Sequence, residues 1–201
     1  MGFEKGGTPM GRPLGGLART TYWLQIVLEE CLPINWSRSG RLLDIGSASG
    51  HIARVWVDEG GLATYCHYEL DACRQAATLG DTPFRWFQSQ GYPENDCWLW
   101  GTDGNRLQIA FTDVVPKGLY GLATFDTRTY ETTYALEMVG HIAARLERNG
   151  CLLSVIDERI NTSYWKDRLH VWFDEVEAIA SPSPRARGLS FFLSRRPLQG
   201  N

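Results

Sequence analysis

The residues best suited to hold a ligand lie in the segment 42–50 (LLDIGSASG), where an apolar run leads into an acid and two glycines. The apolar run predicts a short buried strand. Gly46 lets the chain leave that strand in a tight turn, and Gly50 opens a predicted helix without a β-carbon beside the helix start. Asp44 and the amides of the turn therefore suit a ligand with an amino-acid-like tail, whose ammonium and carboxylate groups need opposite partners.

A second acid follows at the sequence spacing that is typical of a ribose-binding residue. Glu69 ends the next predicted strand, residues 62–69, and lies 19 positions beyond Gly50. An acid at the end of the second strand of a dinucleotide-binding fold accepts hydrogen bonds from ribose hydroxyls, and its charge disfavours a phosphorylated ribose. The turn has the form G-x-x-x-G and offers no lysine, which disfavours NAD and ATP as ligands. A tight turn that binds no ligand is the alternative interpretation.

The elements that must position these residues alternate between helical and strand-like patterns, as in an α/β domain with a largely parallel sheet. Residues 84–106 are irregular and are expected to contain a strand and an insertion. The last two strands are close in sequence and suit an antiparallel pair. Asn149 and Gly150 are expected to end the longest helix in a left-handed conformation. The predicted helices are 20–31, 51–59, 72–79, 131–147 and 162–173, and the predicted strands are 41–45, 62–69, 107–112, 120–125, 151–156, 175–180 and 189–193.

Composition narrows the class of protein. The 201 residues are 43% hydrophobic and 21% charged, which is typical of a globular chain, and the net charge of −3 argues against sequence-independent nucleic-acid binding by the whole surface. The five cysteines include no CxxC pair, so neither a metal site nor a disulfide framework is indicated. A reducing intracellular setting, the cytoplasm or another such compartment, fits best. No apolar run approaches the length of a membrane span. We expect a flexible arm (1–18), one domain (19–197) and a short tail (198–201).

With these features in place, the segment 42–50 resembles the first motif of class I S-adenosylmethionine-dependent methyltransferases, and the resemblance spans about residues 20–196. It implies a three-layer Rossmann-like methyltransferase fold with a mostly parallel seven-stranded sheet and an antiparallel C-terminal strand pair. It also implies S-adenosylmethionine as the cofactor. Asp126, at the end of the fourth strand, then faces the transferred methyl group. The expected cofactor-binding residues are Asp44, Gly46, Ser47 and Gly50 at the methionine part, Glu69 at the ribose and Asp113 at the adenine, with Ala48 and Leu70 beside them.

Residues 18–24 (ARTTYWL) further resemble the S-R-A-A-Y-K-L segment of FtsJ-like RNA 2′-O-methyltransferases. That likeness implies RNA as the methyl acceptor and a Lys-Asp-Lys-Glu catalytic tetrad. Only Asp126 matches the tetrad. Trp23 and Ser190 occupy the positions of the first lysine and the glutamate, and residues 154–157 (SVID) contain no second lysine.

Two main hypotheses follow from this degenerate tetrad. An active methyltransferase would use another arrangement, with Asp126, Tyr130 and Asp157 as the catalytic residues; His141, in mid-helix, is better explained as a structural residue. A catalytically degenerate domain would instead serve as a binding or assembly module. Its contact surfaces for RNA or a protein partner would be the aromatic segment 84–100 and the arginines near the C-terminus (Arg185, Arg187, Arg195 and Arg196). The favoured alternatives are a core role for the aromatic segment and a solvated surface for the arginines. Another nucleotide-binding enzyme is the third alternative.

Overall fold

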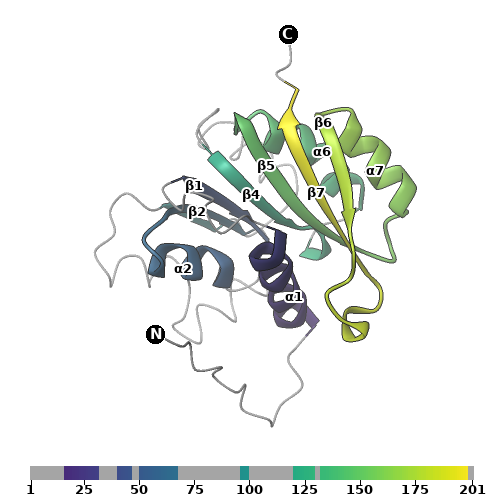
Figure 1. The fold of residues 1–201 in the computed structure, drawn as a ribbon, viewed down its shortest axis with the longest axis horizontal. Coiled ribbons are helices and arrows are strands. Elements are labelled where there is room, and N and C mark those ends of the chain that lie inside the picture. The colour runs from purple at the N-terminus through teal and green to yellow at the C-terminus, as the bar shows by residue number, and fades with distance from the viewer. Residues whose placement is uncertain are drawn as a thin grey trace.

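The computed structural model describes residues 16–31, 40–46, 50–67, 96–99, 120–129 and 132–198. The described residues form one sheet with helices packed against it (Figure 1). The helices are α1 (Gly16–Cys31), α2 (His51–Asp58), α6 (Thr132–Ala143) and α7 (Thr162–His170), with 3₁₀ turns η1 (Thr127–Thr129) and η2 (Pro184–Ala186). The strands are β1 (Arg41–Ile45), β2 (Leu62–His67), β3 (Asp96–Leu99), β4 (Tyr120–Asp126), β5 (Leu146–Asp157), β6 (Phe173–Ile179) and β7 (Leu189–Pro197).

The sheet has seven strands in the order β3-β2-β1-β4-β5-β7-β6. The first five strands in that order are parallel, and β7 runs antiparallel to both of its neighbours, β5 and β6. The direction of winding along the chain reverses between β1 and β4, so the carboxyl ends of these two strands flank the point where open α/β sheets bind ligands. The predicted mostly parallel, seven-stranded sheet with an antiparallel C-terminal pair is confirmed.

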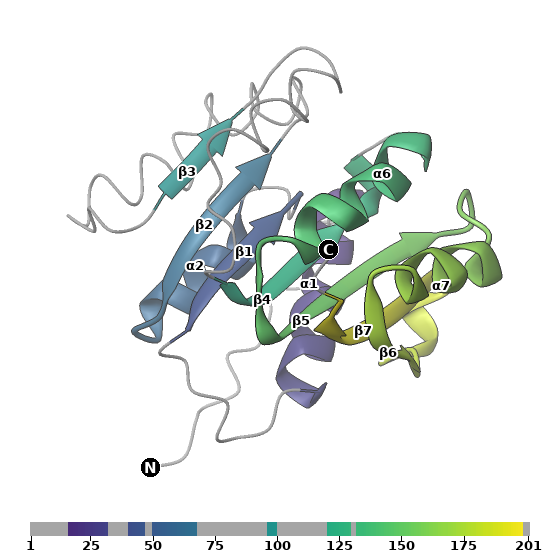
Figure 2. The same ribbon diagram turned by 90° about the horizontal axis from the view of Figure 1, so that it is seen from above.

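Two hydrophobic cores lie on opposite faces of the sheet and give the molecule three layers. One core joins the sheet to α1 and α2 through residues such as Leu24 and Val57. The other joins it to α6 and α7 through residues such as Val139 and Trp165. Viewed from above, α6 and α7 cover one face while α1 and α2 lie behind the strands (Figure 2). Successive side chains of each central strand alternate between the two cores, as the period of a strand requires.

The predicted long helix 131–147 is wrong at its end. Helix α6 stops at Ala143, and β5 has already begun at Leu146. Neither Asn149 nor Gly150 is left-handed, since both lie inside β5 and the positive-φ glycines of the described chain are at other positions. Glycine serves close packing here: a β-carbon on Gly150 would lie 3.0 Å from the main-chain oxygens of both Tyr120 and Glu147.

The other predicted elements agree more closely with the structure. The strand predicted at 41–45 is β1 itself, and the strand expected within the irregular segment is β3. Helix α1 starts at Gly16, four positions before the predicted helix. The helix predicted at 72–79 and the strand predicted at 107–112 lie outside the described residues. None of the helices in the described ranges is long and apolar enough to cross a membrane.

Candidate active site

The turn from β1 into α2 has the geometry that its glycines predict. Gly46 has a φ of 78° and Gly50 a φ of 71°, both in the left-handed region that favours glycine. The amide of Gly46 donates to the main-chain oxygen of Cys66, 2.9 Å away, which ties the turn to the end of β2. Gly50 is the N-cap residue of α2 and supplies no capping side chain of its own. The described ends of this turn therefore place no β-carbon at the start of α2.

Asp44 occupies the centre of this arrangement and is fully buried. Its Oδ2 accepts a hydrogen bond from the Ala53 amide in the first turn of α2, 3.0 Å away. Its Oδ1 accepts one from Thr124 Oγ1 on β4, also at 3.0 Å. Since Gly50 provides no capping side chain, the Asp44 carboxylate takes over that function. Asp44 thus joins β1, α2 and β4, and its predicted contact with a ligand stays a prediction.

Asp126 lies at the carboxyl end of β4, two residues beyond Thr124 and therefore on the same face as Asp44. Its side chain has no exposed surface. The Arg128 main-chain amide donates to Asp126 Oδ1 at 3.1 Å, and Arg128 Nε lies 3.5 Å from the same oxygen. Burial raises the pKa of Asp126 to about 6, because it outweighs the lowering effect of Arg128, and the negative charge of Asp157 adds to the rise. This carboxyl group can therefore gain or lose a proton near neutral pH.

Asp157, at the carboxyl end of β5, has a different environment. Arg159 Nε donates to both of its carboxylate oxygens, at 2.9 and 3.0 Å, and the Arg159 amide donates to Oδ1 at 3.0 Å. Burial by itself would raise the pKa of Asp157, but the hydrogen bonds and charge of Arg159, together with the charge of Arg128, lower it below its usual value. Asp157 therefore stays ionised at neutral pH.

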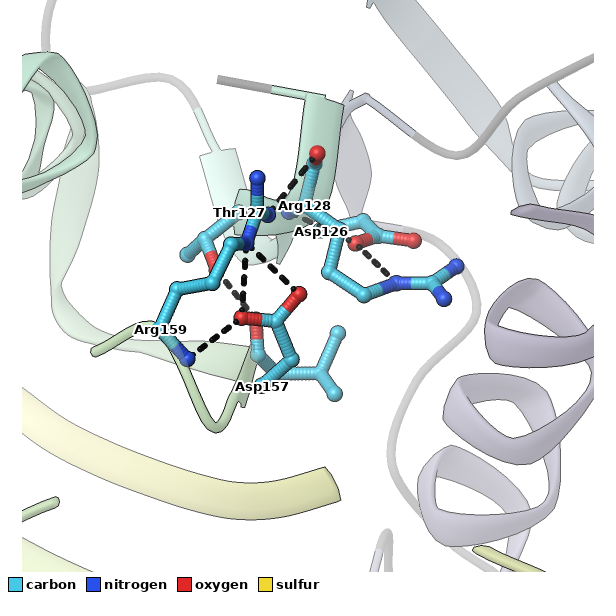
Figure 3. Close-up of polar contacts among 6 residues, drawn as sticks. Asp126, Thr127, Arg128, Asp157 and Arg159 are labelled. Atoms are coloured by element: carbon cyan, nitrogen blue, oxygen red, sulfur yellow. Dashed lines mark hydrogen bonds and ion pairs between the residues drawn. The ribbon is translucent and has the colours of Figure 1, made fainter. Parts of the chain in front are cut away.

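These two aspartates are linked through their arginines (Figure 3). Each aspartate ends a strand and accepts from the amide and Nε of the arginine two residues later. Arg159 Nη2 also donates to the main-chain oxygen of Arg128 at 3.0 Å, and Thr127 Oγ1 donates to the Val155 oxygen at 2.9 Å. The ends of β4 and β5 are thereby held as one polar cluster, called here the Asp-Arg cluster (Asp126, Arg128, Asp157 and Arg159).

Of the predicted catalytic residues, the structure brings Asp126 and Asp157 together. Tyr130 lies outside the described residues, as do five predicted cofactor-binding residues: Ser47, Ala48, Glu69, Leu70 and Asp113. His141 lies on α6, in the layer on the opposite face of the sheet from Asp126, so it does not join the cluster. Within the described ranges, no group of three or more His, Cys, Asp or Glu side chains is placed to hold a metal ion.

A tryptophan and a serine occupy two of the other positions that correspond to the tetrad. Trp23, a residue of α1, packs into the core between this helix and the sheet, with 9% of its surface exposed. Ser190 is half-buried on β7 and pairs with Ile156. Arg128 and Arg159 are the residues that the sequence interpretation missed. Their signal was present as a repeated Asp-x-Arg at 126–128 and 157–159, each directly after a strand.

The late arginines are partly neutralised by acids on the neighbouring strand. Arg195 Nη1 lies 3.1 Å from Glu177 Oε2, and Arg196 contacts both Asp174 and Glu175, at 3.3 and 2.7 Å. These pairs cross from β7 to β6, which is the edge strand of the sheet. Two of the four arginines proposed as an RNA contact are therefore committed to local ion pairs.

Comparisons with known proteins find similarity at the level of the fold but not at the level of the sequence. No protein-family model matches the chain, and no curated protein sequence matches it. Solved structures do match. The PH0226 protein from Pyrococcus horikoshii OT3 has a TM-score of 0.60 at 10% identity, with 90% of each chain covered. A probable spermidine synthase from Corynebacterium glutamicum has a TM-score of 0.61 at 15% identity, with 90% of this chain and 67% of that chain covered.

A third similar structure carries ligands. The 16S rRNA N2 methyltransferase RsmC of T. thermophilus, in complex with AdoMet and guanosine, has a TM-score of 0.59 at 12% identity. This chain is covered over 91% of its length, but it spans only 40% of the RsmC chain. At such low identities the likeness establishes a Rossmann-like methyltransferase fold, and a spermidine synthase among the neighbours shows that the fold serves more than one chemistry.

Proposed function

We propose that the protein is an S-adenosylmethionine-dependent methyltransferase. The observation that carries the proposal is the turn from β1 into α2, in which two left-handed glycines lie at the point where the winding of the sheet reverses. The strand order and the described ends of this turn support a cofactor site at this place. RsmC and PigF, two of the structural neighbours, were solved with AdoMet and SAH respectively, which supports the same class of ligand here.

The residues present fit such a cofactor. Gly46 and Gly50 keep β-carbons away from the turn. Among the first-turn amides of α2, that of Ala53 already donates to Asp44, so the amides that precede it are the donors proposed for a ligand carboxylate. Ser47, Ala48, Glu69, Leu70 and Asp113 are proposed to complete the site, with Glu69 at the ribose and Asp113 at the adenine. When bound, S-adenosylmethionine supplies an electrophilic methyl group. The protein therefore has to align an acceptor with that methyl group and to accept the proton that the acceptor loses.

Asp126 is the residue proposed to accept that proton. A carboxyl group with a pKa of about 6 is mostly ionised at pH 7 to 8, and it can still take up a proton from an acceptor. Because its side chain has no exposed surface, contact with an acceptor requires a neighbouring side chain such as that of Arg128 to move. Asp157 stays ionised and is proposed to keep Arg159 in place. Tyr130 is retained as a further candidate.

RNA is the proposed acceptor class, on the resemblance of residues 18–24 to the FtsJ-like segment. Cysteine usage supports a cytoplasmic or other reducing intracellular setting. RsmC, which acts on ribosomal RNA, supports RNA, whereas several neighbours are O-methyltransferase family proteins whose acceptors are not specified. The second candidate is a degenerate methyltransferase-like module that binds RNA or a protein partner. The burial of Trp23 at the position of the first tetrad lysine favours that candidate.

Calorimetry with S-adenosylmethionine and S-adenosylhomocysteine tests the cofactor, and we expect binding in the micromolar range or tighter. A turnover assay on RNA and small hydroxyl acceptors then compares the wild type with Asp126→Asn and with Asp174→Asn, an exposed carboxylate on the edge strand. We expect Asp126→Asn to lower kcat by about 100-fold or more with cofactor binding unchanged. Absence of binding at millimolar cofactor would refute the enzyme, and cofactor binding without turnover on any acceptor would favour the module.

A further inference from the structure

The main-chain groups of Arg128 are held from two sides. Its N–H donates to Asp126 Oδ1 at 3.1 Å, and its carbonyl oxygen accepts from Arg159 Nη2 at 3.0 Å. With both groups fixed, the peptide planes around Arg128 have little freedom, and the side chain leaves the backbone in a defined direction. That direction carries Nε to within 3.5 Å of Asp126 Oδ1.

Arg159 is itself anchored at the other end. Two donors link it to Asp157 through three hydrogen bonds: its amide donates to Oδ1, and Nε donates to both carboxylate oxygens, all within 3.0 Å. A guanidinium group presents its donors in a rigid plane, so Arg159 can contact Asp157 through Nε while Nη2 reaches the neighbouring turn. A lysine ammonium carries the same charge but lacks this planar fork.

The Asp-Arg cluster has no net charge when both aspartates are ionised, because each arginine is matched by its own aspartate. Attraction of an anionic ligand is therefore a poor explanation for Arg159. The contact that is left over, from Nη2 to the Arg128 carbonyl, joins the turn after β5 to the turn after β4 (Figure 3).

We infer that Arg159 is a positioning residue, which bridges Asp157 and the Arg128 carbonyl and so holds the Arg128 guanidinium against Asp126. The role rests on the proposed function of Asp126, but it concerns a structural property that is measurable without cofactor or acceptor. Of the charged groups in the described chain, those that act on Asp126 are Arg128, from the turn after β4, and Asp157, from the end of β5. Arg159 touches both of them.

The test is a carboxyl ¹³C NMR titration of Asp126 in the whole 201-residue chain without added ligand. The variants are Arg128→Gln, Arg159→Gln, Arg159→Lys and the control Arg195→Gln, which removes an exposed arginine that pairs with Glu177 on the far edge. Loss of Arg128 should raise the pKa of Asp126 by about 1 or more, because a nearby cation favours the carboxylate. We expect both Arg159 variants to raise this pKa by about 0.5 or more, while Arg195→Gln leaves it unchanged.

The lysine variant decides between positioning and charge. A wild-type titration in Arg159→Lys, together with a raised pKa in Arg159→Gln, would mean that charge alone acts and would overturn the inference. A wild-type titration in both variants would overturn it as well. Hydrogen exchange of the Arg128 amide gives a second readout, and it should be faster in Arg159→Lys than in the wild type. Failure of the methyltransferase assay would leave these measurements unaffected, so the two proposals can fail separately.

Discussion

At the scale of single residues, Asp126 and Asp157 occupy equivalent places at the ends of adjacent strands, yet their pKa values move in opposite directions. Asp126 is fully buried, and burial dominates its pKa. Asp157 is partly exposed, and its contacts with Arg159 through both oxygens outweigh the effect of burial. Two acids whose environments separate their pKa values can divide the roles of proton acceptor and fixed charge. This separation supports Asp126 as the group that exchanges protons.

The raised pKa of Asp126 predicts a pH-dependent cost to stability. Its pKa is 3.8 in a model compound and about 6 in the folded protein, so the folded state binds the proton more tightly than the unfolded chain. The resulting stabilisation is complete below about pH 3.8 and is lost as the pH rises through 6. Asp126→Asn has no such loss. We expect its free energy of unfolding, relative to wild type, to increase by about 2 kcal/mol between pH 4 and pH 7.5 in urea denaturation.

Ser154→Ala is the control for this comparison, because neither residue titrates and its effect should be equal at both pH values. A relative stability of Asp126→Asn that is flat or falling between pH 4 and 7.5 would contradict the raised pKa of Asp126.

The position of Asp126 followed from the sequence, since an acid directly after an apolar strand predicts a side chain at the carboxyl edge of the sheet. Its pairing with Arg128 did not follow, because hydrophobic periodicity carries no information on how a side chain after the strand turns back.

At the scale of elements, the segment between α6 and β5 explains where hydrophobic patterning was misleading. Leu146, Glu147 and Arg148 continue the helical spacing of α6, yet they already belong to β5. Strand β5 pairs with β4 in two registers: Tyr120 opposes Leu146, and Leu122 opposes Cys151. One residue of β4 thus faces four residues of β5, an irregularity that only the partner strand imposes. Gly150, which was expected to end a helix, closes this irregularity.

The close approach at Gly150 predicts a cost for adding one methyl group. In Gly150→Ala the new β-carbon would lie 3.0 Å from two main-chain oxygens, which cannot rotate away as a side chain can. We expect the free energy of unfolding to fall by about 1 to 2 kcal/mol in chemical denaturation. Gly121→Ala, at the facing residue of β4, is the matched control: its β-carbon would have only the end of the Glu147 side chain near it, at 4.0 Å. Equal effects of the two substitutions would show that strand propensity, and not contact, governs this site.

At the scale of the whole molecule, the sheet brings together residues that the sequence separates by about 80 positions. The hydrogen bond from Thr124 to Asp44 crosses between β4 and β1, the two strands where the winding reverses. The sequence predicted this architecture well, because alternating strands and helices constrain a parallel sheet to few topologies. It did not predict the structural contacts of Asp44, because an acid beside a glycine turn is equally compatible with a ligand contact and with a helix cap. The positions of Thr124 and α2 show the cap, and the ligand contact stays a prediction.

Asp44→Ala is therefore expected to weaken the connection of β1 to β4 and to α2. It removes the acceptor of the Ala53 amide and leaves the Thr124 hydroxyl buried without its partner oxygen. Loss of a buried, charge-assisted pair of hydrogen bonds should lower the free energy of unfolding by about 2 to 4 kcal/mol. Thr124→Val removes only the second bond, and should cost about 1 kcal/mol in the same urea titration. If the alanine variant lost no more stability than the valine variant, α2 would not depend on Asp44, and the assignment of this carboxylate to the frame of the site would have to be given up.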